Sequence, residues 1–232
     1  MRSCIYLIPS VLDESAIQTI PGYIIDAVKD CSVIFAENER TARRFLKSIC
    51  KEIIIDDYEW FTIHKAEESL LSTFKQKIKE EKNIAIISEA GCPGVADPGQ
   101  LLIATAQEMN ATVKPLVGPS SILLALMASG MNGQQFEFVG YLPIDNSERA
   151  KAITALETSS QKNNSTKIFI ETPYRNNQLI ENLLKICKPS TRLCIAAELT
   201  SDKEYIKNKT IANWNREKPN LHKKPVIFLL HA

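Results

Sequence analysis

Residues 84–99 read IAIISEAGCPGVADPG, and this stretch decides how the chain folds. Four apolar residues of strand length are followed by a turn with three glycines and two prolines, and then by a helical pattern. Proteins of the α/β class build ligand-binding loops in this way, because bare backbone can approach a bound molecule closely. The glycine spacing matches neither the dinucleotide fingerprint nor the phosphate-binding P-loop. The stretch therefore predicts a binding loop without naming its ligand, and an ordinary strand-to-helix connection stays open as the alternative.

Apolar runs of strand length recur along the first half of the chain and alternate with helix-patterned segments. A mostly parallel sheet with helices on both faces is typical of this alternation. Ligands of such sheets bind beyond the carboxyl ends of the strands, where the 88–99 loop emerges. The predicted strands are 5–8, 33–36, 53–55, 84–87 and 112–116. We therefore predict a doubly wound α/β domain over residues 1–116.

The second half, residues 117–232, has fewer helical stretches between its apolar runs. Proline and serines at 119–121 begin a helix over 122–128, which is apolar nearly all round and is expected to be buried between two layers. Two further helices are predicted over 148–158 and 174–187. Strands are predicted at 136–141, 167–171, 192–197, 204–211 and 226–230. This half is predicted to be an α+β domain with a mixed sheet, and we expect the ligand site in the cleft between the two domains.

The composition is that of a globular protein, because 44% of the 232 residues are hydrophobic and 24% are charged. A net charge of +1 gives no general attraction to nucleic acid, so no DNA partner is expected, and an RNA contact would need a local basic face. The six cysteines form no Cys-x-x-Cys pair and only three histidines occur, so no metal site and no disulfide framework is expected. Without an apolar run of about 18 residues or a signal-peptide pattern, we expect a cytoplasmic protein with no membrane span.

Six short segments, four of which contain glycine or proline, occur along the chain in a fixed order. The longest, Ser88–Gly99, fits the pattern S-[D/E]-A-G-x-P-x-x-x-D-P-G, which chance rarely produces. The others are Ile8–Ser10, Ala36–Arg40, Pro115–Ser120, Phe169–Arg175 and Glu198–Thr200. Over nearly the whole chain these segments resemble the tetrapyrrole (corrin/porphyrin) methylase superfamily, and most closely its branch of small-subunit rRNA cytidine 2′-O-ribose methyltransferases.

The resemblance implies two α/β domains, a homodimer, and S-adenosylmethionine bound in the cleft between the domains. It also implies that the cofactor is held largely through backbone groups of Ala90, Gly91 and Cys92. Adenine and ribose need apolar contact and a few backbone hydrogen bonds, which a glycine-bearing turn provides. The further cofactor-binding residues implied by position are Leu12, Val95, Ser120, Ser121, Ile170 and Leu199.

Methyl transfer from a sulfonium is an in-line displacement, so the protein mainly provides position and a dry cleft, and no metal is needed. If the acceptor is a ribose hydroxyl, a positioned carboxylate helps to remove its proton. Carboxylates near strand ends are Glu37, Glu89, Asp97, Glu171 and Glu198. Of these we predict Glu37, Glu89 and Glu171 to be catalytic, together with Arg40. For each carboxylate the alternative role is helix capping or an ion pair with arginine.

Three other features have a structural alternative beside a functional one. Asp97 precedes Pro98 and is expected to cap the following helix. A basic stripe on the helix after Glu37 would contact RNA phosphates or form an ordinary solvated face, and it consists of Arg40, Arg44, Lys47 and Lys51. Cys92 has no neighbouring histidine, so we predict that it contacts the cofactor through its backbone rather than acting as a nucleophile.

The turn after the first strand departs from the family pattern. Where the rRNA enzymes have Pro-Thr-Pro-Ile-Gly-Asn-Leu, residues 9–15 read PSVLDES, which removes the Gly-Asn pair and adds two carboxylates. Three functions therefore stay open: methylation of small-subunit rRNA, methylation of a tetrapyrrole or other small molecule, and S-adenosylmethionine binding without catalysis. We expect ribosomal RNA or the small ribosomal subunit as the partner under the first of these.

Overall fold

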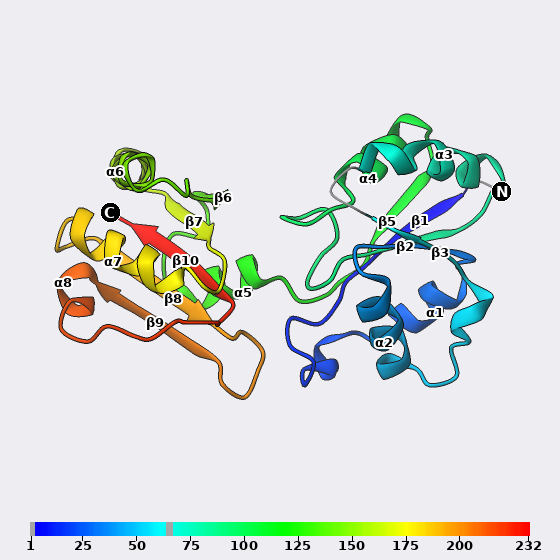
Figure 1. Ribbon diagram of the computed structural model, residues 1–232, viewed down its shortest axis with the longest axis horizontal. Coiled ribbons are helices and arrows are strands. Elements are labelled where there is room, and N and C mark those ends of the chain that lie inside the picture. Colours follow the sequence, from blue (N-terminus) through cyan, green and yellow to red (C-terminus); the bar gives the residue numbers. More distant parts are fainter. Residues whose placement is uncertain (1–2, 64–66) are drawn as a thin grey trace. The chain divides into compact units, whose positions relative to one another are not determined.

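The computed structural model describes residues 3–63 and 67–232. The chain divides into two compact units, Met1–Ser120 and Ser121–Ala232 (Figure 1). The predicted boundary after residue 116 lies four residues before this division. Each unit is built around its own sheet, and the two are described in turn.

The first unit contains a five-stranded sheet in the order β3-β2-β4-β1-β5, with every strand parallel to its neighbours. The strands are β1 (Cys4–Ile8), β2 (Val33–Ala36), β3 (Glu59–Thr62), β4 (Ile84–Ile87) and β5 (Thr112–Pro115). All four residues of β2 and of β4 are buried, as expected for central parallel strands covered on both faces. The carboxyl ends of all five strands therefore lie at one edge of the sheet.

Helices cover both faces of this sheet, which confirms the predicted doubly wound architecture. The helices are α1 (Ile24–Lys29), α2 (Glu39–Ile49), α3 (Leu71–Lys79) and α4 (Gln100–Glu108), with 3₁₀ turns η1 (Ile17–Thr19), η2 (Ile55–Asp57) and η3 (Glu67–Leu70). Ile24 of α1 and Phe45 of α2 pack in one core, whereas Phe74 of α3 and Leu102 of α4 pack in a second core. Figure 1 shows these pairs of helices on opposite sides of the strands.

The predicted strand over residues 53–55 is wrong. Ile53 is buried in the core without belonging to a strand, and Ile55 begins the 3₁₀ turn η2 with Asp56 and Asp57. The strand comes later, as β3, where Phe61 stacks on Phe35 with ring centroids 4.8 Å apart. Edge strands are only partly buried, so the residues of β3 lack the continuous apolar pattern that identifies central strands.

The second unit contains a mixed five-stranded sheet in the order β6-β7-β10-β8-β9. The strands are β6 (Phe136–Tyr141), β7 (Thr166–Ile170), β8 (Arg192–Ala197), β9 (Tyr205–Thr210) and β10 (Val226–His231). β6 and β7 are parallel, and the other three pairs are antiparallel. The predicted α+β organisation is confirmed, and the strand β9 forms one edge of the sheet.

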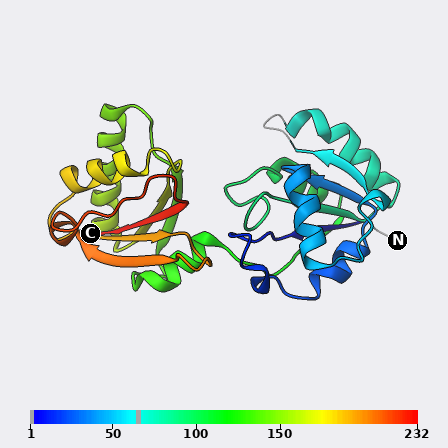
Figure 2. The same cartoon turned by 60° about the horizontal axis from the view of Figure 1, so that its bottom comes forward.

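Four helices accompany this sheet: α5 (Ser121–Ser129), α6 (Asn146–Asn163), α7 (Asn176–Ile186) and the short α8 (Ile211–Trp214). In Figure 2, α6 and α7 lie on one face and α5 lies on the other. We expected α5 to be buried between two layers, but Leu123 and Met127 are 51% and 78% exposed. Only one face of α5, with Ala125 and Leu126, is buried. Within residues 3–63 and 67–232, no helix has the length and apolar character needed to cross a membrane.

Candidate functional site

The loop after β4 is fastened to the turn after β1. Ser10 and Gly91 exchange two backbone hydrogen bonds, with the N–H of Ser10 donating to the carbonyl of Gly91 at 2.8 Å and the N–H of Gly91 donating back at 3.1 Å. The hydroxyl of Ser10, which is 3% exposed, also donates to the carbonyl of Ser88 at 2.9 Å. We call residues 88–99 the glycine loop. Its first half is therefore held at the carboxyl edge of the sheet before any ligand is present.

Two glycines allow three segments to meet at this edge. Gly91 has φ +72°, and a Cβ there would lie 3.4 Å from Cδ2 of Leu12 and 3.7 Å from the carbonyl oxygen of Pro119. Gly118, after β5, packs so closely that a Cβ would lie 2.2 Å from Cβ of Pro9. Lack of space therefore requires glycine at 118, whereas at 91 the left-handed backbone favours it and a Cβ would make ordinary contacts. The predicted cofactor residues Leu12 and Gly91 are thus brought together, and the N–H and carbonyl of Gly91 are engaged by Ser10 rather than pointing free.

A cavity of about 460 Å³ lies between the turn after β1 and helix α2. Leu12 and Ala90, both predicted to bind the cofactor, line it. Thr41 and Phe45 of α2 also line it, as do the exposed ion-paired residues Arg44 and Glu14. The volume is in the range of small-molecule sites. Gly91, Cys92 and Val95 are not among its lining residues, and the Val95 side chain is half exposed.

Two of the predicted catalytic carboxylates are joined at this edge. The N–H of Glu89 donates to Oε2 of Glu37 at 2.8 Å. Oε1 of Glu89 accepts from Nδ2 of Asn38 and from the hydroxyl of Thr41, each at 3.3 Å. Asn38 also caps α2 by accepting from the N–H of Thr41. Arg40, also predicted to be catalytic, is exposed in the first turn of α2.

Asp97 completes an acidic cluster with Glu37 and Glu89. Burial, and then the charges of Glu37 and Glu89, raise the pKa of Asp97 to about 7. The prediction that Asp97 caps the next helix is wrong, because α4 begins at Gln100 and is preceded by Gly99 with φ +113°. Its carboxylate therefore titrates near neutral pH without a capping role.

The cap of α4 comes from a distant residue that the sequence did not single out. The carboxylate of Glu67 accepts from the N–H of Gly99 at 2.8 Å and from the N–H of Leu101 at 2.9 Å. A carboxylate at a helix N-terminus satisfies free N–H groups and complements the helix dipole. Glu67 lies 32 residues before Gly99, so no local pattern marks the pair.

Cys92 lies in the glycine loop as a protonated thiol. Its Sγ contacts the carbonyl oxygen of Pro119 at 3.5 Å. Burial, and secondarily the charge of Asp97, raise the pKa of the Cys92 thiol. Because the thiolate is the reactive form, this shift disfavours a nucleophilic role. Among residues 3–63 and 67–232, no group of three or more His, Cys, Asp or Glu residues could hold a metal ion.

In the second unit, the predicted catalytic residue Glu171 follows β7 and its side chain is fully buried. Oε1 accepts from Nε of Arg175 at 3.0 Å, from Nη2 at 2.7 Å and from the N–H of Thr172 at 2.6 Å. Oε2 is buried and has no hydrogen-bond partner in the described part of the chain. Glu171 is therefore held in an ion pair, with one oxygen left to accept a further bond.

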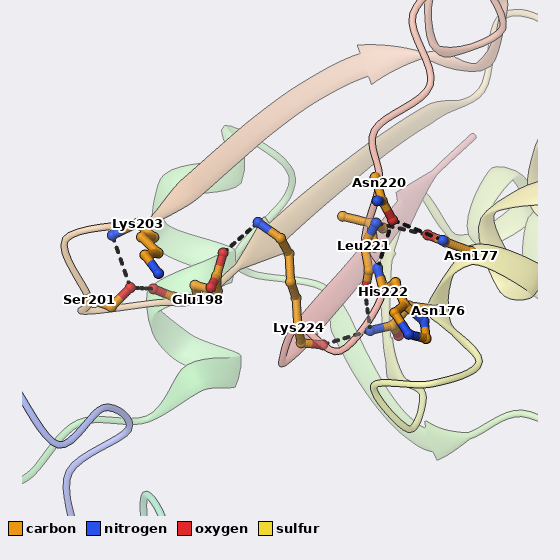
Figure 3. Close-up of polar contacts among 9 residues, drawn as sticks. All are labelled: Asn176, Asn177, Glu198, Ser201, Lys203, Asn220, Leu221, His222 and Lys224. Carbon is orange, nitrogen blue, oxygen red and sulfur yellow. Dashed lines mark hydrogen bonds and ion pairs between the residues drawn. The ribbon is translucent and has the colours of Figure 1, made fainter.

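The remaining predicted residues of the second unit lie at the ends of its elements. Ile170 ends β7, Ser121 begins α5 directly after Ser120, and Leu199 is buried just after β8. Glu198 has φ +51° and pairs with Nζ of Lys224 at 2.6 Å, as Figure 3 shows.

The basic stripe predicted on α2 is interrupted. The guanidinium of Arg44 pairs with Glu14, and Nζ of Lys47 donates to the carbonyl of Lys51 at 2.9 Å. Lys51 lies beyond Ile49, where α2 ends, so its place on the same helix was predicted wrongly. Two of the four cations are thus engaged within the unit.

Comparison with known proteins extends these observations. A model of the family "Tetrapyrrole (Corrin/Porphyrin) Methylases" matches residues 24–214. The chain is similar to two proteins named "Ribosomal RNA small subunit methyltransferase I". The one from Micromonospora olivasterospora is 30% identical over 202 residues, which cover 86% of this chain and 60% of the relative. The one from Escherichia coli O157:H7 is 27% identical over 232 residues, which cover 98% of this chain and 77% of the relative.

A solved structure has the same fold. Uroporphyrin-III-C-methyltransferase from Thermus thermophilus aligns with a TM-score of 0.58 at 15% identity, covering 100% of this chain and 93% of that one. The family match spans most of the chain and both of its units. The chain therefore belongs to the tetrapyrrole (corrin/porphyrin) methylase family.

Proposed function

We propose that this protein is a methyltransferase that uses S-adenosylmethionine to methylate a ribose 2′-hydroxyl of small-subunit ribosomal RNA in the cytoplasm. The observation that carries the proposal is the glycine loop, fastened by Ser10 to the edge of a parallel sheet where α/β proteins bind ligands. The names of the relatives support rRNA as the substrate, and this chain spans 60% and 77% of their lengths.

The residues present fit the cofactor. A Cβ on Gly91 would contact Leu12, so the glycine leaves apolar space open beside that side chain. Leu12, Ala90, Gly91 and Cys92 would hold the cofactor in the first unit. When bound, S-adenosylmethionine supplies a methyl group activated by its sulfonium. By family position, Val95, Ser120, Ser121, Ile170 and Leu199 complete the cofactor-binding set.

The acidic cluster provides the proton acceptor. A general base works best when its pKa lies near the operating pH, and Asp97 has a pKa of about 7. Beside the effect of burial, the charges of Glu37 and Glu89 repel a third negative charge, which keeps the proton affinity of Asp97 high. Arg40, exposed at the start of α2, offers a guanidinium to a substrate phosphate. In this scheme Glu171 holds the turn before α7 in place through Arg175.

The test uses a tritiated methyl donor and small ribosomal subunits that lack the native methylation. We expect label in the RNA, in a linkage that resists alkaline hydrolysis, because a methylated 2′-oxygen cannot attack the neighbouring phosphate. Asp97→Asn should lower kcat by about 100-fold or more, within the usual range for a general base. Its affinity for S-adenosylmethionine, measured by calorimetry, should stay unchanged.

The same assay separates the alternatives. Label in an alkali-sensitive position, or in an added tetrapyrrole but not in RNA, would contradict the proposed acceptor. Tight cofactor binding without label on either substrate would favour a binding module. Absence of binding heat at high micromolar cofactor would contradict the methyltransferase itself.

We also propose that the protein forms a homodimer. Large apolar side chains exposed in the second unit support this, among them Met127 at 78% and Ile144 at 68%. Sedimentation equilibrium should give twice the mass of the chain. Met127→Glu should weaken self-association if α5 takes part, and a monomeric wild type would contradict the proposal.

A further inference from the structure

A second surface lies in the second unit, where two aromatic rings and a lysine meet. Tyr174, in the turn before α7, is 70% exposed. The ring of His222 stands edge-on to it, with centroids 5.9 Å apart and an interplanar angle of 75°. Nζ of Lys223 lies 5.9 Å from the centre of the tyrosine ring. We call Tyr174, His222 and Lys223 the aromatic platform.

The platform is held in place by the start of α7. Asn177 accepts from the N–H of Leu221 at 2.8 Å and donates to the side chain of Asn220 at 3.0 Å. The buried Asn176 donates to the carbonyl of Lys224 at 2.7 Å. Figure 3 shows these bonds on either side of His222. They fix both ends of the segment that carries His222 and Lys223.

A further bond ties this segment to the turn that carries Tyr174. The N–H of Lys223 donates to the carbonyl of Pro173 at 2.9 Å, and Lys223 itself has φ +62°. A left-handed conformation is unfavourable for lysine, so the surrounding contacts must impose it. The rings and the cation are therefore prearranged rather than gathered by chance at the surface.

The platform lies in the more basic part of the molecule. The first unit has 13 Lys and Arg against 17 Asp and Glu, whereas the second has 15 against 10. Residues 201–224 alone have seven cations and three acids. Lysines on an edge strand also discourage strand pairing, which accounts for Lys207 and Lys209 of β9. It does not account for Lys223, which belongs to no strand.

Exposed aromatic rings beside cations are the usual means of binding unpaired bases. Every nucleobase stacks on tyrosine or histidine, and a nearby ammonium strengthens the contact and approaches the phosphate. Paired bases are already stacked in a duplex, so the platform fits a single-stranded or bulged segment. We propose that the aromatic platform stacks an unpaired nucleobase of the RNA substrate, a role that rests on the proposed function.

Fluorescence anisotropy with a labelled single-stranded RNA of about 12 nucleotides tests the stacking. Tyr174→Ala should weaken binding by about tenfold, the effect of losing one stacked base, whereas Tyr174→Phe should stay within about twofold of the wild type. Tyr141→Ala is the matched control, since Tyr141 is another exposed tyrosine of the same unit, at 59%. Lys223→Ala should reduce the salt dependence of log K by about 0.7, as expected for one lost phosphate contact.

An abasic oligomer of the same length identifies the group that is bound. It should bind equally to the wild type and to Tyr174→Ala, because it has no base to stack. Unchanged RNA affinity of Tyr174→Ala, an equal loss in Tyr141→Ala, or no RNA affinity of the wild type would each overturn the inference. Methyl transfer to small subunits by the wild type is measured separately, so a failed platform and a failed methyltransferase give different results. Thermal melting verifies that each variant is folded.

Discussion

The glycine loop and the aromatic platform are both preformed, but they are held by different kinds of contact. In the first unit, backbone groups of Ser10 and Gly91 bind each other directly, and glycine is required where segments cross. In the second unit, side chains of Asn176 and Asn177 hold the segment that carries His222 and Lys223. The glycine loop therefore depends on the conformation of its backbone. The aromatic platform depends on the identity of the side chains that hold it.

The two regions also differ in charge, and this suits different tasks. In the first unit, burial and then the charges of Glu37 and Glu89 raise the pKa of Asp97, which makes it a better proton acceptor. The second unit has an excess of cations, which suits contact with phosphates. A nearly neutral chain therefore combines an acidic edge and a basic surface, which total charge conceals.

The largest expected effect is on the buried ion pair of the second unit. Arg175→Met leaves the carboxylate of Glu171 buried without its cation, and should lower the free energy of unfolding by about 3 kcal/mol. Each unit has one tryptophan, so urea unfolding in a Trp60→Phe background reports on the second unit through Trp214.

The matched control for this pair is Arg192→Met. Arg192 is exposed at the start of β8, and its replacement should change the unfolding free energy by less than about 0.5 kcal/mol. Equal unfolding midpoints for the two variants would show that the Glu171 pair does not stabilise this unit.

The next effect concerns the shape of the glycine loop. Gly91→Val should weaken S-adenosylmethionine binding by about 10- to 100-fold, because the added atoms press on Leu12 and overpacking costs about 1–3 kcal/mol. Gly130 also has a left-handed backbone, with φ +66°, but no atom lies within 4 Å of a Cβ placed there. Gly130→Val therefore introduces similar strain without crowding a neighbour. Calorimetry on the two variants separates an effect local to the glycine loop from a general effect of a strained valine on the fold, and similar affinities would place the cofactor elsewhere.

A smaller effect is the pH dependence caused by Asp97. Its pKa is about 7 in the folded protein and about 3.9 in an unfolded chain, so the folded state binds more protons between these values. Stability due to this group is therefore full below about pH 4 and is lost as the pH rises through about 7. Asp97→Asn should remove this slope and stabilise the protein at pH 8 by about 1 kcal/mol, allowing for solvent screening.

Urea titrations from pH 4 to pH 8 measure that slope. The exposed Asp202 in the turn after β8 provides a control, and Asp202→Asn should keep the slope of the wild type. An unchanged slope in Asp97→Asn would mean that burial and the neighbouring carboxylates do not raise the proton affinity of Asp97 in solution.

An effect of similar size tests the side-chain support at the end of the glycine loop. Glu67→Ala removes the cap that binds the N–H groups of Gly99 and Leu101, and should cost about 1 kcal/mol of stability. The adjacent, exposed Glu68 serves as control, and Glu68→Ala should stay within about 0.5 kcal/mol of the wild type. Thermal unfolding of the three proteins decides whether the cap contributes.

The sequence predicted those elements best that are buried throughout or regularly patterned. β2, β4, β6 and β8 match their predicted limits, because continuous apolar runs bounded by polar residues identify strands. The position of β3 was not predicted, because an edge strand is only partly buried and lacks a continuous apolar run. The exposure of one face of α5 was not predicted, because an apolar sequence does not indicate which neighbouring elements cover the helix.

The candidate site was predictable where its signals are local. Glycines and prolines marked the loop, and strand ends marked Glu37 and Glu89. The bond from Ser10 to Ser88 joins residues 78 apart in sequence, and that from Glu67 to Gly99 joins residues 32 apart. No local pattern encodes such pairs, so the sequence assigned the cap of α4 to Asp97, the nearest acidic residue. Correcting that assignment is what makes Asp97 available as a base.

The pair of backbone hydrogen bonds between Ser10 and Gly91 has a consequence for binding kinetics. A loop that is already ordered adds little conformational entropy cost when a ligand arrives. Association should therefore proceed in one step without a slow rearrangement of the glycine loop, and differences in affinity among loop variants should appear mainly as differences in residence time. Because both hydrogen bonds are made by the backbone, side-chain substitutions at Ser10 should leave this one-step association unchanged.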